Sequence, residues 1–142
     1  MDILHQFPIH APATRVFEAV TAPAGLDRWW TARSAGTPLT GTGYQLWFGP
    51  EYDWRATVTQ CVVDRVFELE LTSATPDWVG SRVGFRLTEG PDGTTVDFSH
   101  TGWASASEHY RISSFCWAMY LRILKRYLEH GESVAYEQRL SV

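Results

Sequence analysis

The stretch SASEHYRISSFCWAMYLRILKRYLEHG, from Ser105 to Gly131, decides the fold of this chain. Ser105 and Glu108 form an S-x-x-E capping box, and Gly131 is the residue type that ends many helices. The pattern between them predicts a helix of about 25 residues, roughly 37 Å long. Its apolar side chains form two adjacent rows, which together make a stripe wide enough to cover a sheet. The rows are Ile112, Cys116, Met119, Ile123 and Tyr127, and Trp117, Tyr120, Leu121, Leu124 and Leu128.

The chain before this helix has a period of two residues, which is typical of strands. From Gly43 onward, apolar and polar residues alternate in five runs, separated by turn residues such as GPEYD, SATPD and EGPDG. The segment from Asp2 to His10 alternates in the same way, and Pro8 favours an edge position for it. The short links predict a curved antiparallel meander of about six strands with one apolar face.

Two short helices are expected between the first strand and the others. APATRVFEAVT, residues 11–21, has apolar residues at helical spacing with Pro12 near its first position, and Pro23 ends it. AGLDRWW, residues 24–30, follows as the second helix. This order predicts an α+β fold in which the long helix covers the sheet. Because a straight helix does not lie flush on a twisted sheet, we expect space for a small molecule between them.

Composition excludes several classes of function. The 142 residues predict one domain, residues 1–142. The net charge of −4 comes from 16 acidic and 12 basic residues, and the basic ones are scattered, so we expect no nucleic-acid partner. Neither a membrane-spanning stretch nor the layout of a signal peptide is found in the sequence, which favours a cytoplasmic protein.

No motif predicts a metal, a cofactor or a nucleophile. Cys61 and Cys116 lie far apart without a CxxC pattern, so neither a disulfide scaffold nor a zinc site is indicated. A phosphate-binding glycine loop, a nucleophile elbow and an HExxH motif are all missing from the sequence. We therefore expect no cofactor and no metal.

Three stretches in this order resemble a known superfamily: IHAPATRVFEAVTAPAGLDRWW (9–30), TTVDFSHTGW (94–103) and WAMYLRILKRYLEHGE (117–132). The chain resembles the START-like, or SRPBCC, superfamily, within the branch homologous to the C-terminal domain of the heat-shock-protein-90 ATPase activator. The resemblance implies the helix-grip fold and a hydrophobic cavity between sheet and long helix. It also implies a ligand that is a hydrophobic or aromatic small molecule. Some relatives catalyse polyketide cyclisation or dehydration, so an enzyme of that kind, a co-chaperone-like interaction module and a homodimer are alternatives to consider.

The candidate ligand-binding residues are the large aromatic side chains and one histidine. Two tryptophans that are adjacent on a helix point about 100° apart, so one of Trp29 and Trp30 can pack in the core while the other lines the cavity entrance. His100 shares an apolar strand face, where it could orient a ligand or transfer a proton. The full set is Trp29, Trp30, Trp47, Trp54, His100, Trp103, Trp117 and Tyr120.

Each of these assignments has a structural alternative. The tryptophan pair could only clamp the short helices, and His100 could be a hydrogen-bonded core residue without a catalytic partner. The remaining aromatic side chains could fill the cavity instead of lining it. These alternatives stay open at the level of sequence, and no catalytic residue is assigned.

Overall fold

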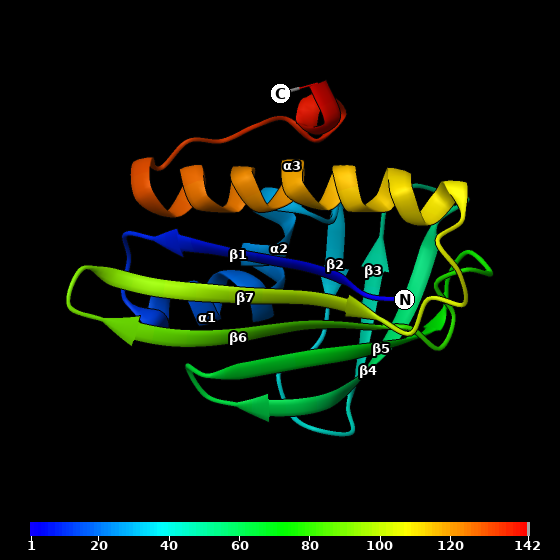
Figure 1. Ribbon diagram of the computed structural model, residues 1–142, viewed down its shortest axis with the longest axis horizontal. Coiled ribbons are helices and arrows are strands. Elements are labelled where there is room, and N and C mark those ends of the chain that lie inside the picture. The colour runs from blue at the N-terminus through cyan, green and yellow to red at the C-terminus, as the bar shows by residue number, and fades with distance from the viewer. Residues whose placement is uncertain (142) are drawn as a thin grey trace.

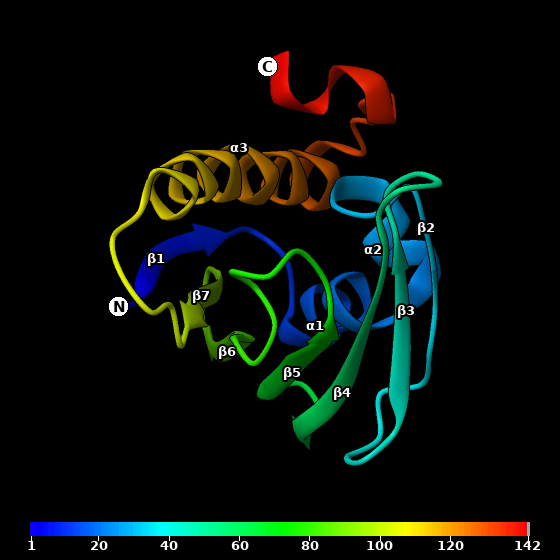
Figure 2. The ribbon, with the colours of Figure 1, turned by 90° about the vertical axis from the view of Figure 1, so that its right-hand side faces the viewer.

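The computed structural model describes residues 1–141 and shows seven antiparallel strands that curve beneath one long helix (Figure 1). The order across the sheet is β1-β7-β6-β5-β4-β3-β2. Seen from the side, the sheet forms a half-open wall under α3 (Figure 2). The strands are β1 (Ile3–Ile9), β2 (Arg33–Ala35), β3 (Gly43–Trp47), β4 (Asp53–Val62), β5 (Val66–Ser73), β6 (Arg82–Gly90) and β7 (Gly93–Thr101). This is the predicted α+β helix-grip fold.

The helices lie where the pattern places them. The two short helices are α1 (Ala13–Thr21) and α2 (Pro23–Trp29), and Pro23 occupies the first turn of α2. The long helix α3 runs from Glu108 to His130, and a 3-10 helix, η1 (Tyr136–Ser141), follows it. Figures 1 and 2 show the C-terminal segment lying on the side of α3 away from the sheet.

The two ends of α3 give different outcomes for the predicted caps. Gly131 ends the helix in the left-handed conformation, with φ of 67°, as predicted. The prediction of a capping box formed by Ser105 and Glu108 is wrong, because the helix begins at Glu108 and its N-cap is Ser107. The hydroxyl of Ser107 accepts a hydrogen bond from the Tyr110 amide over 3.2 Å, whereas Ser105 precedes the first turn.

One of the two apolar rows on α3 is more deeply buried than the other. Trp117, Leu121, Leu124 and Leu128 of one row are buried. In the other row Ile123 is buried, whereas Ile112 is 52% exposed. The sequence pattern alone does not distinguish the rows, because both are apolar and both have helical spacing.

Two features of the sheet differ from the simple alternation. The strand β2 is additional; its three residues are too few to show a period, and it forms by pairing with β3. In β4 the register shifts between Val58 and Gln60, so the face that points inward changes. Cys61 then packs against the core, and Val62 is 52% exposed. As Pro8 predicts, β1 lies at the sheet edge.

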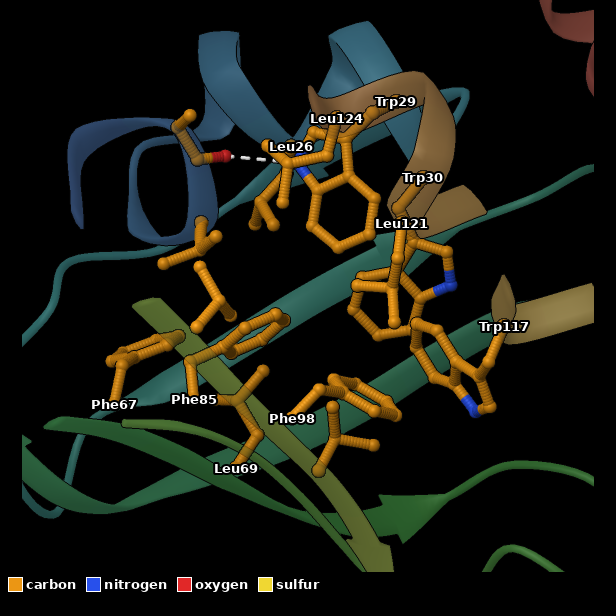
Figure 3. Close-up of a cluster of buried hydrophobic side chains, with 14 of the residues drawn as sticks. Leu26, Trp29, Trp30, Phe67, Leu69, Phe85, Phe98, Trp117, Leu121 and Leu124 are labelled. Atoms are coloured by element: carbon orange, nitrogen blue, oxygen red, sulfur yellow. Dashed lines mark hydrogen bonds between the residues drawn. The ribbon is translucent and has the colours of Figure 1, made fainter. Parts of the chain in front are cut away.

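The central space between sheet and helix is filled with side chains. Figure 3 shows Leu26 and Trp29 from α2 meeting Leu121 and Leu124 from α3 above the phenylalanines of the sheet. The indole of Trp29 is fully buried, and its N–H donates to the carbonyl of Ala19 over 2.9 Å. The predicted space between sheet and helix is therefore not continuous along α3, because packed side chains fill it next to α2.

Candidate functional site

An open cleft of about 360 Å³ remains beside the N-terminal half of α3. It lies where the end of α2, the β3–β4 connection, β4, the β5–β6 connection, α3 and the C-terminal segment converge. Most of its wall is aromatic. The lining residues are Trp30, Phe48, Tyr52, Trp54, Thr75, Trp78, His109, Ile112, Ser113, Cys116, Trp117, Tyr120 and Tyr136.

Four tryptophans and Phe48 form a connected wall around this cleft. The ring centroids of Trp30 and Trp117 are 5.1 Å apart, and Phe48 lies 5.6 Å from Trp30. Phe48 in turn lies 4.9 Å from Trp54, which is 4.8 Å from Trp78. Trp78 stacks on Trp117 at 5.9 Å and closes the ring of contacts. Each indole is held by at least two aromatic neighbours, so the wall is preorganised for an apolar ligand.

His100 lies behind this wall in a fully satisfied hydrogen-bond chain. The indole N–H of Trp117 donates to His100 Nδ1 over 3.0 Å, so Nδ1 must be unprotonated. The ring proton is then on Nε2, which donates to Ser81 Oγ over 2.8 Å. Ser81 Oγ donates onward to the carbonyl of Trp78 over 2.6 Å. One histidine thus positions two tryptophans of the cleft.

The protonation of His100 follows from its surroundings. Its side chain is fully buried, and burial, with a smaller effect from the charge of His109, lowers the pKa of His100 to about 3. The ring is neutral at pH 7, and both nitrogens are occupied by protein groups. His100 is therefore a hydrogen-bonded core histidine that does not line the cleft. A ligand-orienting or proton-transferring role for it stays a prediction.

The other predicted residues divide into those at the cleft and those elsewhere. Trp30, Trp54, Trp117 and Tyr120 line it. Three further predicted residues do not line it. Trp29 is enclosed by the core, as described above. Trp103 packs 4.8 Å from the His100 ring, behind the wall. Trp47 points to the outer face of the sheet, whereas Tyr44 and Leu46 of the same strand point inward. On the outer face, the Arg33 guanidinium lies 4.3 Å from the centre of the Trp47 ring.

Sequence reasoning missed the cleft residues that come from connections. Trp78 and Thr75 belong to the β5–β6 connection, and Tyr52 precedes β4. The segments SATPD and GPEYD are predicted only as turns. Tyr52 lies within a predicted turn and Trp78 directly follows one, although a turn does not require a large aromatic side chain. This mismatch is the sequence signal that could have identified both residues.

The C-terminal segment completes one side of the cleft. The hydroxyl of Tyr136 donates to the Phe48 carbonyl over 3.1 Å. The Arg139 guanidinium is 5% exposed and donates to the carbonyls of Asp27 and Thr31 over 2.6 and 3.0 Å. Because these carbonyls belong to α2 and the residues after it, Arg139 attaches the segment to the same region that supplies Trp30.

The polar groups of the cleft are mainly neutral donors. Burial raises the pKa of Tyr120 to about 12 and also raises the pKa of the Cys116 thiol, so both stay protonated at neutral pH. At the rim, His109 Nδ1 lies 3.1 Å from a carboxylate oxygen of Asp77. A protonated thiol is a weak nucleophile, so the arrangement suits binding better than covalent chemistry.

Neither a metal site nor a membrane span is found in the described part of the chain. Within residues 1–141, no three His, Cys, Asp or Glu side chains gather closely enough to hold a metal ion. Over the same residues, no helix combines the length and apolarity needed to cross a membrane.

Comparison with known proteins places the chain in a family. Residues 10–129 match the family described as activator of Hsp90 ATPase homolog 1-like protein. The chain belongs to this family. No curated protein is significantly similar to it in sequence. The family match begins directly after β1 and runs to Glu129 of α3, and it confirms the resemblance to the heat-shock-protein-90 activator branch of the START-like superfamily.

Solved structures of similar proteins support this membership. The Aha1 dimer of Colwellia psychrerythraea is 25% identical with a TM-score of 0.85, over 94% of this chain and 99% of that one. Protein SSP2350 of Staphylococcus saprophyticus is 20% identical with a TM-score of 0.78, over 95% and 96% of the two chains. CalU16 of Micromonospora echinospora is 22% identical with a TM-score of 0.73, over 99% and 81%. The last two likenesses concern the fold alone.

Proposed function

We propose that this member of the activator of Hsp90 ATPase homolog 1-like family binds an apolar, predominantly aromatic small molecule in the cleft beside α3. The observation that carries the proposal is the wall formed by Trp30, Phe48, Trp54, Trp78 and Trp117 around an open volume of about 360 Å³. This volume lies within the range of about 300–1,000 Å³ that is typical of ligand pockets.

The physical basis of binding is the removal of apolar surface from water. Ligand surface placed against the indoles contributes about 25 cal/mol per Å² before the entropic costs of association are subtracted. Stacked and edge-on contacts with aromatic rings add about 0.5–1.5 kcal/mol per pair, which favours a planar aromatic ligand over an aliphatic one. Trp117 and Trp78 are already held in place by His100, so little side-chain ordering is needed.

The alternatives from sequence have less support at this site. A cyclase or dehydratase that uses His100 as its acid or base would need that ring to reach the ligand, and both of its nitrogens are bound to protein groups. Action as an interaction module stays a prediction. So does a homodimer, although the Colwellia relative is described as a dimer; sedimentation of the purified protein checks it.

Calorimetric titration with 2-acetylnaphthalene tests the proposed function. We expect one molecule to bind per chain. Cys116→Trp places an extra indole in the cleft and should abolish binding. The matched control is Phe115→Trp, which adds the same group one residue away, at a position that is 69% exposed and does not line the cleft. Binding that survives Cys116→Trp, or wild-type protein that binds no aromatic probe, contradicts the proposal.

A further inference from the structure

Two residues that line the cleft each carry a buried polar atom with no hydrogen-bond partner among residues 1–141. These atoms are the indole nitrogen of Trp78 and the hydroxyl oxygen of Thr75. Trp78 as a whole is only 7% exposed. Buried hydrogen-bond donors nearly always have an acceptor in folded proteins, so two such atoms without a partner in cleft-lining residues require an explanation.

Other buried tryptophans of this protein provide a comparison for the unpaired indole nitrogen of Trp78. Trp29 donates to the carbonyl of Ala19, and Trp117, which lines the same cleft, donates to His100. The indole nitrogen of Trp103 is also unpaired within the described residues, but Trp103 is not a lining residue. Trp78 therefore combines an unpaired donor with a place in the cleft wall.

The turn that carries both atoms is fixed by its own backbone bonds. The amide of Trp78 donates to the carbonyl of Thr75 over 2.9 Å, and the Trp78 carbonyl accepts from the Ser81 amide and hydroxyl. Ser81 is held in turn by His100. Because the backbone of Trp78 is fully used, its indole N–H is the donor left for a ligand.

On the basis of the proposed function, we infer that the cleft selects aromatic molecules that carry an uncharged oxygen acceptor, such as a ketone. The Trp78 N–H donates to this acceptor, and the Thr75 hydroxyl supplies a second polar contact. Asp77 lies between them in the turn; it is not a lining residue, and its carboxylate lies near the rim, 3.1 Å from His109 Nδ1. Its negative charge disfavours a carboxylate at this position and favours a neutral carbonyl.

A pair of ligands with the same shape isolates this contact. 2-Acetylnaphthalene has a ketone where 2-isopropenylnaphthalene has a C=CH2 group. By calorimetry we expect wild-type protein to bind the ketone about tenfold more tightly, which corresponds to about 1.4 kcal/mol. Equal affinities overturn the inference and leave the proposed function standing. Failure of both ligands to bind overturns the proposed function itself.

Substitutions then assign the preference to the turn. Trp78→Phe and, independently, Thr75→Val should each reduce the preference for the ketone, with Trp78→Phe bringing it below about twofold. The matched control is Trp54→Phe, which removes similar ring area from the same wall and should weaken both ligands equally. A preference that survives both turn substitutions overturns the inference.

Nuclear magnetic resonance gives a direct readout in the unsubstituted protein. The indole N–H signal of Trp78, assigned by its loss in Trp78→Phe or by its contacts to neighbouring protons, should move downfield with the ketone and not with the hydrocarbon. A signal that responds identically to both ligands contradicts a hydrogen bond at this nitrogen.

Discussion

The indole of Trp117 donates a hydrogen bond to His100 over 3.0 Å, and this contact makes the buried histidine an acceptor. The direction of the bond fixes the tautomer of the ring and so the bond to Ser81. Although histidine is often associated with catalysis, His100 has a structural role, because it positions the tryptophan wall from behind. The consequences of this role are measurable as stability and as pH dependence.

Replacing His100 should destabilise the fold. In His100→Leu the buried N–H of Trp117 loses its acceptor. We therefore expect the free energy of unfolding, measured by urea titration, to fall by about 2 kcal/mol. Adding Trp117→Phe removes the stranded donor, and the double variant should lose less than the sum of the single losses. His109→Leu, at the exposed rim, is the control and should change stability little. Strict additivity of the two substitutions would contradict the bond.

His100 should also make the protein less stable in acid. Its pKa is about 3 in the folded state against 6.5 for a free side chain, so below pH 6.5 the unfolded state binds the extra proton. Stability should therefore fall as pH decreases, by about 2 kcal/mol between pH 7.5 and pH 5 from this residue. Urea unfolding of wild type and His100→Leu at both pH values isolates the effect. Equal losses in the two proteins would exclude it.

Release of the C-terminal segment should follow from removing Arg139. Arg139→Met keeps the length of the side chain but loses the bonds to the carbonyls of Asp27 and Thr31. We expect faster amide hydrogen exchange in Tyr136–Ser141, with the exchange rates in β6 unchanged. We also expect weaker binding of 2-acetylnaphthalene, because Tyr136 would no longer line the cleft. Arg122→Met, at an exposed position of α3, is the control. Unchanged exchange in the segment would show that other contacts hold it.

Contact between the short helices should make Gly25 irreplaceable. A Cβ at this position would lie 2.7 Å from Ala19 Cα and 2.8 Å from the Ala19 carbonyl oxygen, both backbone atoms of α1. Gly25→Ala should therefore cost about 1–3 kcal/mol, although alanine normally favours helices. Gly43→Ala is the control, because its nearest new contact would be 3.8 Å. Thermal unfolding of both variants checks this, and a stabilised Gly25→Ala would refute it.

Much of the architecture was predictable because the signals are local. The period of α3 and its glycine cap at Gly131 depend only on neighbouring residues. The same holds for Pro23 at the start of α2 and for the alternation of β1. The candidate site was predictable only in part: Trp30, Trp54, Trp117 and Tyr120 lie at the cleft, and Trp29, Trp47, His100 and Trp103 do not.

Tertiary structure alone decided which of several equivalent side chains reach the cleft. Trp29 and Trp30 are adjacent and equally apolar, yet only Trp30 lines it, because Phe85 and Ala19 enclose its neighbour. Trp78 joins the site from a connection that has no periodic signal. The sequence by itself determined most of the elements and their order, through contacts a few residues apart, whereas β2 depends on its pairing with β3. The site depends on contacts between segments tens of residues apart, which no local pattern records.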